Sequence, residues 1–161
     1  MVEINSTMTD NFPKQSLTAK SALHTTIDMP FEDAVVAVQL EHELADFETI
    51  NVSYLDKMIQ GTMGKKVPKV ALIIVCHPQI AYHTLKIDPA IAGMLPCTTV
   101  VYESALDDSV HVHHVSSTKA IRDLGLVSSD SKDSLDDLVE LTSEKMKIVW
   151  NNILTHVVAT S

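Results

Sequence analysis

The run VALIIVC at residues 70–76, followed directly by His77 and Pro78, carries the strongest structural signal in this chain. An uninterrupted apolar run of this length is typical of an interior β-strand that is covered on both faces. Pro78 cannot continue the strand and suits the first position of a helix. These residues therefore predict a central strand that passes through a tight turn into a helix ending at about Ile87.

Before this run, the spacing of the apolar residues changes from strand to helix and back. Residues 23–29 alternate between apolar and polar side chains, which predicts a half-buried strand. Pro30 and the two carboxylates soon after it favour the start of a helix. We expect the apolar face of that helix to contain Phe31, Val35, Val38, Leu44 and Phe47, with Ala34 and Val36 beside it. The other elements predicted in this half are a strand over residues 49–54 and a short helix over 55–63 that Gly64 ends.

After the run, prolines and a glycine predict a loop over residues 88–96. Two β-rich runs follow, at residues 98–103 and 110–115, and the acidic turn SALDDS between them predicts a β-hairpin. Residues 118–124 are expected to form a short helix that ends at a glycine.

The last part of the chain predicts one long helix. Ser134 is expected to cap it, with Asp137 as its capping-box partner, and the helix is expected to continue to about Val157. Its predicted apolar stripe consists of Leu135, Leu138, Val139, Met146, Val149, Ile153, Leu154 and Val157, with Trp150 on the edge. Because this stripe and a sheet edge would be free to pair, and twofold dimers are the commonest oligomers, we expect a homodimer.

The elements interleave in the order βαβ(α)βαββαα. This order predicts an α+β fold in which helices pack on a mostly antiparallel sheet. Residues 1–20 are polar and without periodicity, so we expect a flexible N-terminal tail. Residues 21–160 are then a single α+β domain that ends in the long C-terminal helix.

The composition excludes several classes of protein. The chain has 161 residues, 45% of them hydrophobic, and a net charge of −9. This acidic surface disfavours nucleic acids and anionic membranes as partners. The N-terminus has no apolar signal segment and no run is long enough to cross a bilayer, so we predict a cytoplasmic protein whose two cysteines are free thiols.

The first candidate for chemistry is Cys76, at the predicted junction of strand and helix. Backbone N–H groups at a helix start can lower the pKa of a thiol, and Cys76 is therefore a candidate catalytic nucleophile or soft metal ligand. The alternative is that Cys76 is the last buried residue of its strand. Cys97, just after Pro96, is also predicted at a strand end. We expect Pro78 and Pro96 to bracket a ligand-binding pocket with both cysteines in its wall.

The second candidate is the sequence His111-Val112-His113-His114. On a strand, His111 and His113 lie on one face about 7 Å apart, and His114 lies on the other. Two imidazoles on one face suit a transition metal, with Glu103 as a carboxylate that could orient one of them. The alternative is a solvated hairpin in which these histidines bind nothing.

Cys76-His77-Pro78, then Ala81, Asp88-Pro89, Gly93 and Leu95-Pro96-Cys97, then Val101-Tyr102-Glu103 together resemble the signature of the domain-of-unknown-function 302 (DUF302) family. The family carries Asn where this chain has His77, a change that adds a metal ligand or preserves a side-chain cap. The resemblance implies a compact α+β fold that commonly associates as a dimer. It implies no established reaction, and haem, metals and sulfur metabolism are the roles suggested for such proteins.

Two functions follow from these residues. In the first, the protein is a small binding module that holds a metal, haem or sulfur-bearing ligand. The expected contacts are Cys76, His77, Pro78, Pro96 and Cys97, with His111, His113 and His77 as metal ligands. In the second, it is a thiol-dependent enzyme with Cys76 as nucleophile.

Overall fold

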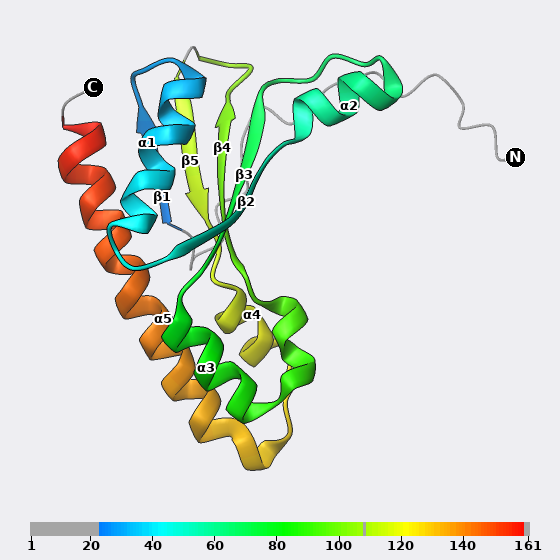
Figure 1. The fold of residues 1–161 in the computed structure, drawn as a ribbon, viewed down its shortest axis with the longest axis vertical. Helices are drawn as coiled ribbons and strands as arrows, with labels where there is room; N and C mark the ends of the chain where they lie inside the picture. Colours follow the sequence, from blue (N-terminus) through cyan, green and yellow to red (C-terminus); the bar gives the residue numbers. More distant parts are fainter. Residues whose placement is uncertain (1–22, 108, 160–161) are drawn as a thin grey trace, which may run out of the picture.

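Five antiparallel strands form one sheet in the order β1-β5-β4-β3-β2 (Figure 1). The computed structural model describes residues 23–107 and 109–159, so the tail predicted over residues 1–20 lies outside the described residues. The strands are β1 Leu23–Ile27, β2 Glu48–Tyr54, β3 Val70–Cys76, β4 Cys97–Glu103 and β5 Val110–His114. The predicted α+β class and the predicted order of elements are confirmed.

The predicted helix-ending and helix-starting residues act as expected. Helix α1 starts directly after Pro30, and α2 ends at Gly64, whose φ of 66° is a left-handed conformation that glycine adopts without strain. Helix α3 starts at Pro78. The helices are α1 Phe31–Glu43, α2 Leu55–Met63, α3 Pro78–Ile87, α4 Ser117–Asp123 and α5 Lys132–Asn152, with short turns η1 Pro89–Met94 and η2 Ser129–Ser131 and a π-helical end η3 Ile153–Val158.

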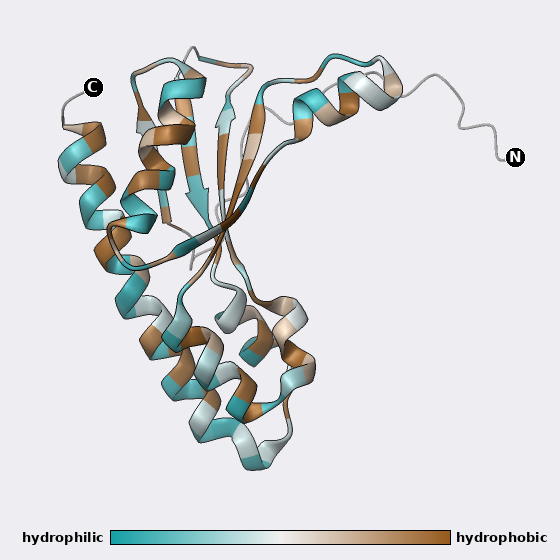
Figure 2. Cartoon of the chain, in the orientation of Figure 1, coloured by the Kyte–Doolittle hydropathy of each residue, from teal (hydrophilic) through white to brown (hydrophobic). Residues whose placement is uncertain are grey.

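Helix α5 begins three residues earlier than predicted, with Ser131 at the N-cap position, so the predicted cap at Ser134 is wrong. The turn η2 runs directly into α5, so Ser134 lies inside the first helical turn, where its side chain cannot cap the helix start. The predicted apolar stripe of this helix is buried against the rest of the chain, except at exposed Leu154. Figure 2 shows these hydrophobic residues recurring along α5 between hydrophilic ones. The stripe is therefore core and is not available to a second copy.

Within the described residues, α1 and the C-terminal segment η3 cover one face of the sheet, whereas α3 and α4 pack against α5 beyond the ends of the strands (Figure 1). In β3, Ala71, Ile73 and Val75 are buried, while the residues between them are only half-buried. Strands β4 and β5 show the same alternation. The prediction that β3 is covered on both faces is wrong, because a sheet layered with helices on one side buries alternate residues even where every residue is apolar. The open face presents Leu72, Ile74, Val100, Tyr102, His111 and His113, all half-buried.

Two residues predicted on the buried face of α1 are exposed. Leu44 is 69% exposed and Val36 is 54% exposed. Leu44 keeps helical backbone angles and donates its N–H to the Leu40 oxygen, so it lies one turn beyond Leu40 on the exposed side of the helix. Val36 lies a quarter turn or more from Val35 and Val38, which do pack in the core.

Candidate functional site

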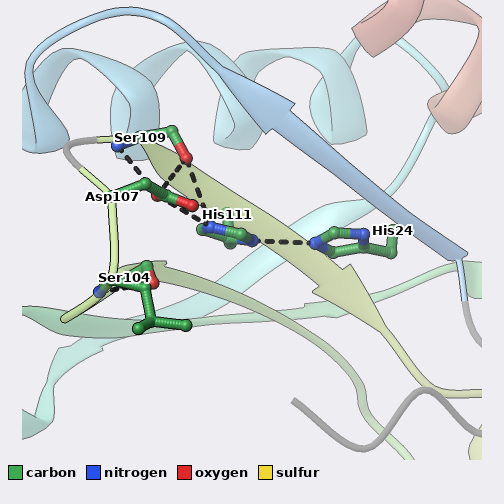
Figure 3. Close-up of polar contacts among 6 residues, drawn as sticks. His24, Ser104, Asp107, Ser109 and His111 are labelled. Atoms are coloured by element: carbon green, nitrogen blue, oxygen red, sulfur yellow. Dashed lines mark hydrogen bonds and ion pairs between the residues drawn. The ribbon is translucent and has the colours of Figure 1, made fainter. Parts of the chain in front are cut away.

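The open face of the sheet brings together three histidines from β1 and β5, which are the first and last strands along the chain and neighbours in the sheet. His111 and His113 lie on this face of β5, and His24 of β1 lies directly opposite His113 in the strand register. The Nε2 atom of His24 is 3.0 Å from the Nδ1 atom of His111, and Figure 3 shows the two rings facing each other. The two residues are 87 positions apart in the chain. The pairing of β1 with β5 therefore creates a histidine pair that the local sequence does not contain.

A carboxylate orients His111 from its other side. Its Nε2 atom is 3.3 Å from Oδ1 of Asp107 and 3.2 Å from the hydroxyl of Ser109 (Figure 3). Because the carboxylate accepts, Nε2 of His111 carries the proton and donates it to Asp107. Nδ1 of His111 is then unprotonated and accepts the 3.0 Å hydrogen bond from Nε2–H of His24. The Ser109 hydroxyl also donates to Asp107, and this bond is the main reason why the pKa of Asp107 is lowered.

Glu103, the carboxylate predicted to orient a histidine, does not do so. It lies opposite Val110 in the register, and its nearest ionic partner is Lys69, at 3.9 Å. Asp107 takes that role because the hairpin turn folds back over His111.

Aromatic contacts hold the histidine rings in place. The Tyr102 ring stacks on His111, with centroids 5.0 Å apart, and His24 stacks on His111 from another side at 5.2 Å. His113 meets the edge of His24 at 6.0 Å. Its Nε2 atom is buried and has no hydrogen-bond partner within the described part of the chain. The cluster thus contains one hydrogen-bonded histidine pair and one ring nitrogen that has no partner among the described residues.

His24 is exposed, yet its partial desolvation and its histidine neighbours favour the neutral form. Partial desolvation lowers its pKa, and the neighbouring His111 and His113 lower it further. Neutral imidazole is the form that binds metals. Across residues 23–107 and 109–159, no three His, Cys, Asp or Glu side chains are already arranged to enclose an ion. A three-ligand site here therefore requires His113 to turn toward the pair.

The Cys76 thiol has the opposite electrostatics to those of an activated nucleophile. It is half-buried at the end of β3, opposite Glu48 in the register. Burial raises its pKa, and the negative charge of Glu48 raises it further. The thiol lies 3.9 Å from the backbone oxygen of His77. At neutral pH this cysteine is protonated, which does not favour the thiol-enzyme interpretation.

Cys97 lies on the other face of the sheet. It is 2% exposed and opposite buried Val75, whereas Cys76 follows Val75 and faces the open side. Burial raises the pKa of Cys97 to about 11, and Cys76 adds to the rise. Both cysteines are free thiols. The strand alternation thus directs the two thiols to opposite faces at neighbouring strand ends, and a pocket wall that both cysteines share stays a prediction.

His77 caps helix α3. Its Nδ1 atom accepts a hydrogen bond of 3.2 Å from the backbone N–H of Gln79, and the ring packs against Phe47. Burial is the main cause of its lowered pKa, with Lys145 contributing. Of the two roles open to a histidine here, the structure shows the cap. Pro78 starts the helix beside it, while Pro96 follows a cis peptide bond with Leu95 at the entry to β4.

Sequence reasoning did not identify His24, Asp107 or Tyr102 as site residues. His24 does belong to the polar face of the predicted first strand, and Asp107 to the predicted acidic turn. The missing information was which strand pairs with β5. The pairing of β1 with β5 depends on the packing of the whole sheet, and neither strand's own sequence indicates it.

No helix of the described residues is long and apolar enough to cross a membrane.

Comparisons with known proteins agree with the fold. No curated protein matches the chain. A crystal structure of an uncharacterized conserved DUF302 protein from Bacillus stearothermophilus superimposes with a TM-score of 0.64 at 14% sequence identity, covering 81% of this chain and 99% of that one. The model of the domain of unknown function DUF302 matches residues 23–151. Since this match spans most of the chain, the protein belongs to the DUF302 family.

Proposed function

We propose that this protein binds a transition-metal ion on the open face of its sheet, through ring nitrogens of His24 and His111 with His113 as third ligand. The observation that carries the proposal is the 3.0 Å separation of Nε2 of His24 and Nδ1 of His111. Two nitrogens that each lie about 2.0–2.1 Å from a tetrahedral zinc ion are about 3.3 Å apart from each other. The two rings are now joined by a hydrogen bond that is slightly shorter than this spacing, so a small separation of the rings would let both nitrogens bind one ion.

The surroundings of the pair support the same function. The hydrogen bond from His111 to Asp107 leaves Nδ1 of His111 unprotonated, and a carboxylate behind a ligating histidine is the usual outer partner in metal sites. His24 can move its proton to its own Nδ1 atom and so free Nε2 for the ion. His113 offers a nitrogen that has no partner among the described residues. Three imidazoles suit zinc, copper or nickel.

We expect Zn(II) to bind chelator-treated protein with one site per chain, measured by calorimetric titration. Loss of a residue that hydrogen-bonds a metal ligand typically weakens metal binding by roughly 10–100-fold. His24→Ala and His111→Ala each remove a ligand itself, so each should weaken zinc binding by at least that factor. Asp107→Ala should weaken binding by about 10–100-fold, because His111 loses the group that fixes its proton.

Two further variants locate the site. His83→Ala removes an exposed histidine on α3 and serves as the matched control, with unchanged affinity expected. His77→Ala should also leave the affinity unchanged, because that ring is engaged in the cap. Loss of zinc in His77→Ala, or full affinity in both His24→Ala and His111→Ala, would rule the proposed site out. Haem and a sulfur-bearing ligand near Cys76 and Cys97 stay predictions from the sequence, as does a cytoplasmic location.

We also propose that the protein forms a homodimer, through surfaces other than the C-terminal helix. Strands β1 and β2 form the two edges of the sheet, and the outer side of each edge pairs with no further strand among the described residues. The open face of the sheet also carries half-buried apolar side chains. Light scattering at micromolar concentration should return twice the chain mass of 17.7 kDa. A single-chain mass under these conditions would contradict the proposal.

A further inference from the structure

The helix-covered face of the sheet contains a second group of polar side chains, which the histidine pair does not touch. His42 of α1, Thr99 of β4 and His114 of β5 are all fully or almost fully buried. Thr99 and His114 are direct partners in the strand register. Cys97 precedes Thr99 by two residues and faces the same side. A buried thiol and a buried imidazole are therefore diagonal neighbours, within reach of each other across two strands.

The hydrogen bonds in this group run in one direction. Nδ1 of His42 lies 2.7 Å from the Val38 carbonyl oxygen and must donate to it. Nε2 of His42 therefore accepts from the Thr99 hydroxyl, at 2.9 Å. Nδ1 of His114 lies 3.2 Å from the Thr98 carbonyl oxygen and donates there, with the Thr99 oxygen 3.4 Å away. The proton of His114 is thus fixed on Nδ1.

The chain of hydrogen bonds ends in a bare acceptor. With the proton on Nδ1, Nε2 of His114 offers a lone pair, and this atom is buried without a partner among the described residues. The Ser117 hydroxyl is buried beside the Cys97 thiol, and its hydrogen bonding to the sulfur lowers the pKa of Cys97 against the larger opposite effect of burial. Buried polar groups are rarely left without a partner, and each such group needs an explanation.

A histidine whose Nδ1–H is held by a backbone carbonyl is oriented as metal-ligating histidines are. We propose that Nε2 of His114 and Sγ of Cys97 bind one copper(I) ion inside the helix-covered face. When the Cu–S bond forms, the thiol releases its proton to solvent, and no electron is transferred. Thiolate selects copper(I), and two ligands suffice for this ion. A copper(I)–thiolate pair is also neutral, so burying it avoids the cost of a net charge in the core.

The test uses the full chain with His24→Ala and His111→Ala, so that the proposed surface site is absent. Anaerobic titration of copper(I) against a coloured chelator should show one ion per chain. Cys97→Val and His114→Asn should each reduce the affinity at least about 100-fold, since each removes one of two ligands. Cys76→Ala is the matched control, because it removes the cysteine that is not a proposed ligand, and it should leave the affinity for copper(I) unchanged.

Three results would overturn the proposal: no copper(I) bound, unchanged affinity in both ligand variants, or loss of copper in Cys76→Ala. Circular dichroism of each variant checks the fold. Should a ligand variant unfold, X-ray absorption at the copper edge decides, because the proposal requires one sulfur and one nitrogen neighbour and a sulfur-only shell excludes it. A Cys97→Val variant that keeps His24 and His111 lacks the proposed copper site but retains the proposed surface site. Zn(II) binding to this variant therefore tests the surface site alone, and either proposal can be contradicted without the other.

Discussion

Acidification of the metal-free protein from pH 6.5 to 4 is expected to lower the free energy of unfolding by about 3 kcal/mol through His114 alone. Burial lowers the pKa of His114 from 6.5 to about 4, and the charge of His42 contributes to the shift. The unfolded chain takes up a proton at this histidine near pH 6.5, whereas the native state resists it until about pH 4. At about 1.36 kcal/mol per pKa unit, stability is complete above pH 6.5 and declines as the pH falls through this window.

Other groups act in the same window or below it. Burial also lowers the pKa of His42, which shares the Thr99 hydroxyl with His114, so the observed loss should exceed that from His114. The charges of His113 and Lys119 also disfavour the charged form of His114 and lower its pKa. The pKa values of Glu32 and Glu43 are lowered from 4.5 and that of Asp107 from 3.8, so the stability that these carboxylates contribute begins to be lost only at the acidic end of the window.

Urea unfolding at several pH values measures this effect. His114→Asn keeps a donor for the Thr98 carbonyl and removes the titrating ring, so its stability should fall less steeply between pH 6.5 and 4. Thr142→Val is the matched control, because Thr142 is equally buried and does not titrate. A His114→Asn variant with the slope of the wild type would show that His114 is not the source.

Phe47→Ala is expected to destabilise the fold by about 3–5 kcal/mol, which corresponds to a melting temperature lower by roughly 10 °C. The Phe47 side chain is 2% exposed and lies between two histidine rings. The centroid of His77 is 5.1 Å away and that of His42 is 6.0 Å away, both edge to face. Truncation leaves a cavity beside the residue that caps α3 and the residue that accepts from Thr99.

Leu44→Ala is the control for this prediction. Leu44 lies three positions before Phe47 and was expected on the same buried face, but it is 69% exposed. Its truncation should change stability by no more than about 0.5 kcal/mol. Calorimetric melting of the two variants compares them directly. Equal losses at both positions would mean that Leu44 is packed and the assignment of this face is wrong.

Local signals account for the elements that the sequence predicts well. Helix starts and ends are set by the backbone properties of single residues. Helices start at or directly after Pro78 and Pro30, and one ends at Gly64, whatever surrounds these residues. The strands at residues 70–76 and 98–103 are equally local, because β-branched side chains recur in each. Ser134 failed as a cap because a preceding turn, without a strong signal of its own, extended the helix.

The sequence by itself determined the α+β class, the order of elements and the separation of His111 from His114 onto opposite faces. Period and alternation along one strand are enough for these. Only the tertiary structure decided that the sheet is covered on one side, that Cys76 and Cys97 face apart, and that His24 meets His111. An apolar run such as residues 70–76 reads the same whether one face or two are covered. The partner of a strand is determined by the packing of the whole sheet. The contact between His24 and His111, 87 positions apart, therefore cannot be predicted from either strand alone.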